Sequence, residues 1–182
     1  VTHVERGTRG DDEGALVGEG EAVHILCGAR QLKADEALAV ERVEALGGAA
    51  AVIPAAPLVT HHADCEWPFR QNSDFWYLTG FDEPDAVALF LPHKPEGERF
   101  VLFVQPKEPS AEVWNGFRWG CEGAVSQFGA DLAHPRNELP QLLADYLKGA
   151  EGIAFRVGRH PEVEPLVLQA WAAQLDRAPR SG

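Results

Sequence analysis

The chain has 182 residues, of which 45% are hydrophobic and 24% are charged, and its formal net charge is −12. A chain of this length can form one domain with a hydrophobic core and is short for two. Nucleic acids and anionic membranes bind surfaces rich in Lys and Arg, so the acidic composition argues against both as partners. No apolar run approaches a length of about 18 residues, so we expect no membrane-spanning helix.

The cysteines indicate a reducing compartment. Cys27, Cys65 and Cys121 are odd in number, lie far apart and include no C-x-x-C pair. A disulfide framework or a zinc ribbon needs paired cysteines. The first residues are polar and rich in Gly, without the apolar stretch of a secretory signal. We therefore expect a cytoplasmic protein.

The first third of the chain leads from a poorly ordered segment into a helix and a strand. Residues 1–32 are rich in Gly and show no sustained hydrophobic period, and only the short run at 23–27 could form a strand. Residues 34–48 predict a helix, because their apolar side chains lie near helical spacing between an acidic start and a Gly pair. Residues 49–54 predict a buried strand, and 57–69 predict a loop.

Three short apolar runs follow, at 75–79, 86–91 and 100–104. Turn-forming residues separate them, which predicts antiparallel strands joined by hairpins. Both faces of the 75–79 run are apolar, as in a central strand that is covered on both sides. The side chains that we expect to be buried, including one from a later strand, are Phe75, Tyr77, Leu89, Phe103 and Phe155.

The rest of the chain alternates helices with one more strand. Residues 109–116 predict a short helix, and a second helix is expected from Asn137 to a stop at Gly149. Residues 152–157 predict a strand and 161–176 a final helix. Helices and strands alternate without a strict βαβ rhythm, so the sequence predicts an α/β domain with a mixed sheet.

Two segments resemble metal sites in composition only. In HHADCE (61–66) the adjacent histidines cannot both point to one side of a strand, and no second group of spaced ligands accompanies them. HPEVE (160–164) lacks the H-E-x-x-H spacing of zinc peptidases. Cys121 has no positive neighbour closer in sequence than Arg118, which favours an unreactive thiol. We therefore predict no metal ligand and no catalytic residue in this chain.

A specific resemblance comes from two segments. EWPFRQNSDFWYLTGF (66–81) combines a polar start, an aromatic triplet and a Gly-aromatic stop, and EVWNGFR (112–118) follows at some distance. Together they resemble the N-terminal domain of aminopeptidase P, the Xaa-Pro aminopeptidase of the creatinase and prolidase superfamily. The resemblance assigns residues 33–177 to this domain and 178–182 to the start of a linker, and leaves 1–32 outside. It implies a ribonuclease H-like α/β fold around a six-stranded mixed sheet with flanking helices.

The motif that carries the resemblance is expected to be structural. Arg70 and Asp74 can form an ion pair, while Asn72 and Ser73 are suited to side-chain hydrogen bonds with the backbone of the turn before the aromatic triplet. Gly80 breaks the apolar run. On physical grounds alone, a row of aromatic residues is more often packing than a ligand site.

The resemblance also implies a function that lies mostly outside this chain. In this family a C-terminal pita-bread domain holds two metal ions, usually manganese, which activate the water that attacks the bond before proline. None of its ligands, two Asp, one His and two Glu, falls on a residue of this sequence. The N-terminal domain packs against the catalytic half of a neighbouring subunit in a homo-oligomer. The residues that match Trp114 and Arg118 help to wall that active site.

Two questions stay open at this point. Trp114 stands near Gly116, Phe117 and Trp119, so it can be core as well as wall. The chain itself can be the N-terminal domain of such a peptidase. Alternatively, it is a free-standing, non-enzymatic module that keeps the fold and binds a partner.

Overall fold

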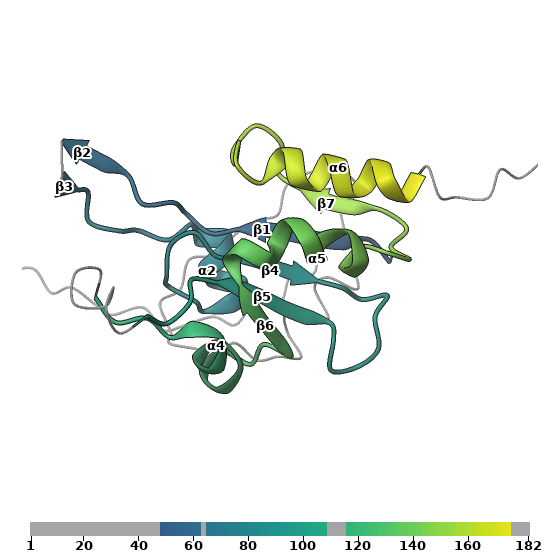
Figure 1. Cartoon of the computed structure of the whole chain (residues 1–182), viewed down its shortest axis with the longest axis horizontal. Coiled ribbons are helices and arrows are strands. Elements are labelled where there is room, and N and C mark those ends of the chain that lie inside the picture. Colours follow the sequence, from purple (N-terminus) through teal and green to yellow (C-terminus); the bar gives the residue numbers. More distant parts are fainter. Residues whose placement is uncertain (1–47, 63–64, 109–115, 176–182) are drawn as a thin grey trace, which may run out of the picture. The chain divides into compact units, whose positions relative to one another are not determined.

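Five short segments build one mixed sheet whose inner strands are buried on both faces. The computed structural model describes residues 48–62, 65–108 and 116–175, all of which lie in one unit of the chain, Leu32–Gly182. The strand order of the sheet is β6-β5-β4-β1-β7 (Figure 1). The strands are β1 (Ala50–Pro54), β4 (Val87–Phe90), β5 (Phe100–Val104), β6 (Leu132–Pro135) and β7 (Ile153–Phe155).

The pairing directions explain why the sheet is mixed. Strand β1 pairs antiparallel with β4 and parallel with β7. Strand β5 pairs antiparallel with β4 and parallel with β6. The predicted α/β class is confirmed, as are the strands expected at 49–54, 86–91, 100–104 and 152–157, apart from their end residues. Within the described residues the sheet has five strands, one fewer than the six expected for the domain.

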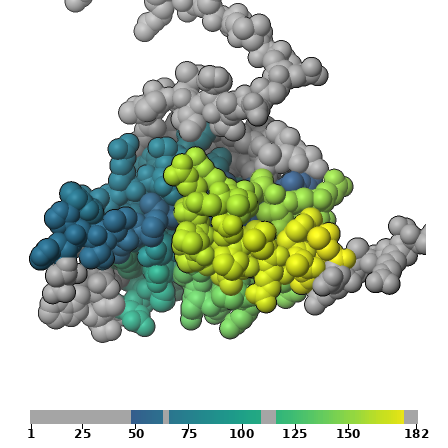
Figure 2. Space-filling view, turned by 90° about the horizontal axis from the view of Figure 1, so that it is seen from above, coloured from purple at the N-terminus to yellow at the C-terminus, as the bar shows by residue number. Residues whose placement is uncertain are grey.

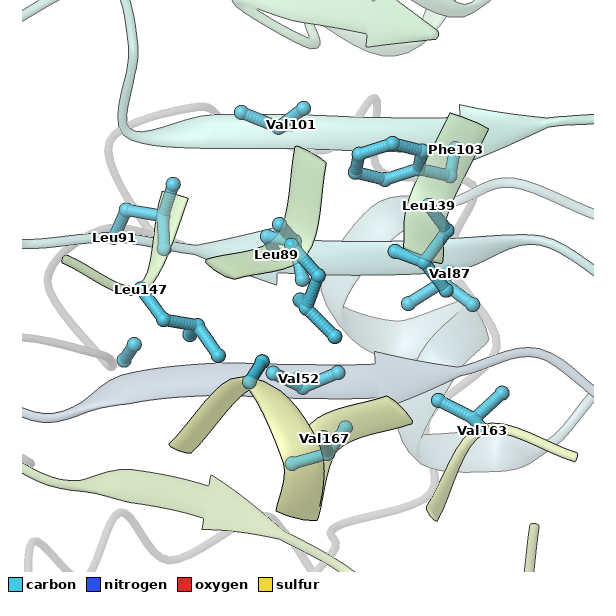
Figure 3. Close-up of a cluster of buried hydrophobic side chains, with 13 residues drawn as sticks. Val52, Val87, Leu89, Leu91, Val101, Phe103, Leu139, Leu147, Val163 and Val167 are labelled. Carbon is cyan, nitrogen blue, oxygen red and sulfur yellow. The ribbon is translucent and has the colours of Figure 1, made fainter. Parts of the chain in front are cut away.

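Helices cover both faces of the sheet, and the alternation of side chains along each strand supplies both cores. Helices α2 (Ser73–Thr79) and α4 (Gly120–Phe128) pack on the face that includes Phe90, Phe100 and Leu102. Helices α5 (Leu139–Tyr146) and α6 (Glu164–Leu175) pack on the opposite face, which Figure 3 shows in close-up. There the strands contribute Val52, Leu89 and Phe103. Successive strand residues point to opposite faces, so an unbroken apolar run serves both.

The second face is closed by the C-terminal part of the domain. The short 3-10 helix η1 (Arg136–Glu138) precedes α5, and α6 follows β7. Figure 2 shows α6, in yellow, on the surface of the domain seen from above. The helices predicted from Asn137 and at 161–176 are thus confirmed, although each begins a few residues later as a regular α-helix. The strand proposed at 23–27 lies outside the described residues, and so do the helices proposed at 34–48 and 109–116 except for their last residues, Gly48 and Gly116.

The prediction of a central strand at 75–79 is wrong, because this segment is part of helix α2. Phe75 and Thr79, four residues apart, point into the core, as helical spacing requires. Tyr77, which we expected to be buried, is 52% exposed. Three adjacent aromatic residues favour a strand by propensity, but contacts with the sheet decide the local structure here.

Two smaller expectations also need correction. The 57–69 segment is not simply a loop, because β2 (Thr60–His62) and β3 (Cys65–Glu66) form an antiparallel hairpin. This hairpin extends away from the five-stranded sheet (Figure 1). Phe155 is only partly buried, because β7 is the last strand of the sheet order. Among the described helices, none is long and apolar enough to cross a membrane.

Candidate functional site

The site is built from the loop that follows β1 and the motif at 70–80, and Gln71 connects them. Its Oε1 accepts hydrogen bonds from the backbone N–H groups of Ala56 at 2.8 Å and Asn72 at 3.0 Å. Its Nε2 donates to the carbonyl oxygens of Phe81 at 3.3 Å and Glu83 at 3.0 Å. A single amide therefore holds three backbone segments together. Sequence reasoning missed Gln71, which stands inside the motif but was not among its singled-out residues.

The other motif residues shape helix α2 and its attachment. Asn72 Nδ2 donates to the Pro54 carbonyl across a long 3.5 Å. Asp74 Oδ1 accepts from the Phe75 N–H at 3.0 Å. We expected Asp74 to form an ion pair with Arg70. Its partner is instead Arg156, just after β7, whose Nη1 lies 3.6 Å from Asp74 Oδ2. The helical form of this segment places Asp74 beside the end of that strand.

Glu83 is the second residue that the sequence did not single out. It follows the motif in the 81–84 turn, and only 5% of its surface is exposed. Its Oε1 accepts a hydrogen bond from the backbone N–H of Trp119 at 2.6 Å. A buried charged group needs such a partner, and a bond to an ionised acceptor is stronger than one between neutral groups. This bond ties the 81–84 turn to the residue next to Arg118.

Aromatic side chains continue the connection from the core to the surface. Phe81 packs edge-on against Phe128, and Phe128 against Trp119, with ring centroids 4.9 Å and 5.4 Å apart. Trp119 in turn packs edge-on against the exposed Phe117 at 5.0 Å. Lys107 Nζ lies 4.9 Å from the centre of the Phe117 ring, within the range of a cation–π contact. The residues on either side of Arg118 are therefore packed in place.

These elements surround an open hollow of about 390 Å³. Three carboxylates and one guanidinium reach it, so its charge is mainly negative. Its lining is Leu58, Glu66, Phe69, Asp82, Glu83, Pro84, Phe117, Arg118 and Trp119. The base of the β2–β3 hairpin, the 81–84 turn and the segment before α4 thus meet at one surface.

Asp85 follows Pro84, a residue that lines the hollow, and both its backbone conformation and its carboxyl pKa are unusual. Its backbone has φ 58, in the left-handed region that few residues other than Gly adopt. Burial raises the pKa of the Asp85 carboxyl, and the positive charges of Arg136 and Arg118 act against this shift. Arg136 Nε donates to the Asp85 carbonyl at 3.0 Å. Arg118 is therefore close enough to act on the Asp85 carboxyl.

Comparison with known proteins gives the family. The family model for the N-terminal domain of aminopeptidase P matches residues 31–154. The chain belongs to this family. The Xaa-Pro aminopeptidase of Escherichia coli K12 is 40% identical over 123 residues, which are 68% of this chain and 28% of that protein. Human Xaa-Pro aminopeptidase 3 is 39% identical over 83 residues, or 44% of this chain and 16% of that protein.

Solved structures agree with the family and with the fold. The Pseudomonas aeruginosa aminopeptidase PepP matches with a TM-score of 0.74 and 31% identity, over 84% of this chain and 35% of that one. The low-pH form of E. coli aminopeptidase P matches with a TM-score of 0.73 and 33% identity, also over 84% and 35%. The chain thus spans about a third, or less, of the length of these relatives.

Within this aminopeptidase P N-terminal domain, the two residues proposed as a pocket wall have different standing. Arg118 is partly exposed and lines the hollow. Trp114 lies outside the described residues, so the choice between wall and core stays open for it. The role of both residues in a neighbouring active site stays a prediction.

The metal chemistry of the family does not fit the described part of this chain. No three side chains of His, Cys, Asp or Glu within it come together in a way that could hold a metal ion. His61, a candidate by composition, packs edge-on against Trp67 at 4.1 Å. Burial raises the pKa of the Cys121 thiol, which disfavours the reactive thiolate. We therefore derive no catalytic step on these residues.

Proposed function

We propose that this chain acts as the N-terminal domain of an Xaa-Pro aminopeptidase, an enzyme that releases the N-terminal residue preceding proline. The observation that carries the proposal is the family match over residues 31–154, together with 40% identity to the E. coli Xaa-Pro aminopeptidase. The chemistry belongs to a catalytic domain outside these residues, with manganese as the expected metal. This chain alone is proposed to be non-catalytic.

The proposed task of the domain is assembly and completion of the substrate pocket. Trp114 and Arg118 would wall the active site of a neighbouring subunit in a homo-oligomer. The placement of Arg118 supports this role, because it lies at an open surface beside packed aromatic residues. A wall residue contacts the peptide without touching the metals, so its contribution is to substrate positioning. We also propose a cytoplasmic location, because the sequence has no pattern of paired cysteines.

A chimera tests this proposal. Residues 31–175 of this chain, which include the family match and helix α6, would replace the corresponding domain of the E. coli Xaa-Pro aminopeptidase. We expect the chimera to hydrolyse peptides with proline in the second position. We expect Trp114→Ala to lower kcat/KM by about 10- to 100-fold, or roughly 1.4–2.7 kcal/mol, and Arg118→Ala to lower it in the same direction. The melting temperature should change little.

The matched control is Trp76→Ala, which removes a half-exposed Trp from α2 that does not line the hollow. It should leave kcat/KM unchanged. If Trp114 belongs to the core instead, its loss will lower the melting temperature by many degrees while activity per folded molecule holds. A folded, assembled chimera without peptidase activity would contradict the proposed function and favour a non-enzymatic binding module.

A further inference from the structure

We infer that Glu83 is a positioning residue for the pocket wall: its buried carboxylate fixes the backbone beside Arg118. This inference rests on the proposed function and names a residue that the wall depends on. Glu83 itself reaches the hollow from the 81–84 turn. Its distinguishing contact is the 2.6 Å hydrogen bond that its Oε1 accepts from the Trp119 N–H.

The position of Glu83 is itself fixed by the family motif. Gln71 Nε2 donates to the Glu83 carbonyl at 3.0 Å, and Gln71 Oε1 accepts from the Ala56 N–H at 2.8 Å. Ala56 lies in the loop after β1, an inner strand of the sheet between β4 and β7. A continuous set of hydrogen bonds therefore runs from β1 through Gln71 and Glu83 to Trp119. These hydrogen bonds join backbone groups of three segments, so they restrict the movement of the Trp119 backbone.

The Trp119 side chain packs closely on helix α4. A Cβ added at Gly123 would lie 2.8 Å from Trp119 Cβ, which shows how closely the indole stem packs on α4. Gly120, at φ 63, would place a Cβ 2.9 Å from Lys107 Cβ. The chain turns sharply at Gly120, so α4 does not continue backwards through Arg118. Two hydrogen bonds therefore hold the Trp119 backbone just before this turn: its carbonyl accepts from the Gly123 N–H at 3.2 Å, and its own N–H donates to Glu83.

The inferred role requires a hydrogen-bond acceptor at the position of Glu83 Oε1. Gln offers a carbonyl oxygen at nearly the same place as Glu83 Oε1, whereas Ala offers none. The Glu83→Gln variant should therefore keep the wall in position and Glu83→Ala should release it. Asp82 is the matched control, because it is the exposed neighbour of Glu83 in the turn and also lines the hollow.

Amide hydrogen exchange of the 182-residue chain measures the positioning directly. We expect Glu83→Ala to speed exchange at residues 117–119 by about 10- to 100-fold, the range for losing a hydrogen bond to a charged group. Exchange in β5 should stay unchanged. Glu83→Gln should restore most of the protection, and Asp82→Ala should behave as the parent. Unchanged exchange at 117–119, or an equal increase throughout the domain, would overturn the inference.

Activity of the chimera then shows whether Glu83 positions the pocket wall or only stabilises the domain. Glu83→Ala should lower kcat/KM of the chimera as Arg118→Ala does, and should add little on the Arg118→Ala background, because both act through one contact. Glu83→Gln should rescue activity. If Arg118→Ala lowers kcat/KM while Glu83→Ala does not, the wall stands and Glu83 has no positioning role. If Arg118→Ala itself has no effect, the proposed wall fails, and the role inferred for Glu83 fails with it.

Discussion

Phe75 and Trp76 are neighbours in the chain, yet they stand in opposite environments. Phe75 is fully buried in the cluster that also contains Phe81 and Phe90, while Trp76 is 48% exposed. Successive residues of a helix point about 100° apart, so a helix on a sheet can bury one aromatic side chain fully and leave the next one half-exposed. At this position the aromatic character of a residue does not predict its role, and its place in the helical turn does.

Phe75→Ala is predicted to destabilise the domain by about 3–5 kcal/mol, the range for emptying a large aromatic site in a core. Chemical denaturation of the 182-residue chain measures this loss. Trp76→Ala is the control, and its effect should be much smaller, because about half of that side chain already faces solvent. Equal losses in the two variants would show that the burial assigned to Phe75 is wrong.

The sequence could predict burial where both faces of an element are covered. Leu89 and Phe103 were expected in the core, and both are fully buried. The prediction that Tyr77 is buried was wrong, because it assumed a strand where the chain forms a helix. Gln71 and Glu83 were not recognised at all. Their roles depend on hydrogen bonds between loops that are distant in sequence, and no local pattern of residue types encodes such bonds.

At the scale of elements, helix α2 had start and stop residues that the aromatic run obscured. Asn72 stands at its N-cap position and Asp74 in its first turn, a favourable place for an acidic side chain. Gly80 ends the helix at φ 65, and its N–H donates to the Trp76 carbonyl at 2.8 Å. The Thr79 hydroxyl donates to the Phe75 carbonyl and accepts from the Phe81 N–H. These contacts fix the exit from the helix.

Gly80→Ala is predicted to cost about 1–2 kcal/mol, because a residue with a Cβ is strained in the left-handed region. The control is Gly152→Ala, where the added Cβ would make an ordinary contact of 3.6 Å with Ala49. There the change should be neutral or slightly stabilising, by about 0.4–1 kcal/mol, because it restricts the unfolded chain. Thermal melts of both variants test the pair. A Gly80 variant as stable as the control would contradict the capping role.

The strands were more predictable than the connections between them. The runs at 86–91 and 100–104 are apolar at every strand position, which is typical of strands covered on both faces. Strand β6, with the sequence LAHP, was not predicted, because it is short and only partly buried. The β2–β3 hairpin was missed as well. Strand β2 is exposed, and the hairpin carries no alternation of apolar and polar residues that sequence reasoning could detect.

At the scale of the whole molecule, the chain matches only part of each relative, and this leads to a prediction about activity. The purified 182-residue chain, supplied with manganese and a peptide with proline second, should show no hydrolysis above a metal-only control. The reason is that the described residues contain no group of side chains able to hold a metal ion, whereas two-metal hydrolysis needs two ions about 3.5–4 Å apart.

The control is the E. coli Xaa-Pro aminopeptidase under the same conditions, which shows that the assay detects the activity. Repurification of the chain and a chelator complete the test. Turnover that persists after repurification and disappears with the chelator would contradict the prediction. It would place a metal site in the segments outside the described residues.

The pairing of β1 with β7 has a consequence for how the domain is made. Ala50 of β1 pairs with Ile153 of β7. Strand β7 therefore leaves the ribosome only after most of the domain has been synthesised. Until then β1 has one open edge, and the face with Val52 and Leu89 lacks the cover of α6. Open edges and uncovered apolar faces promote aggregation, and pairing between distant segments is slow. We therefore expect a nascent chain interrupted before β7 to aggregate or to depend on chaperones rather than to form a smaller stable domain.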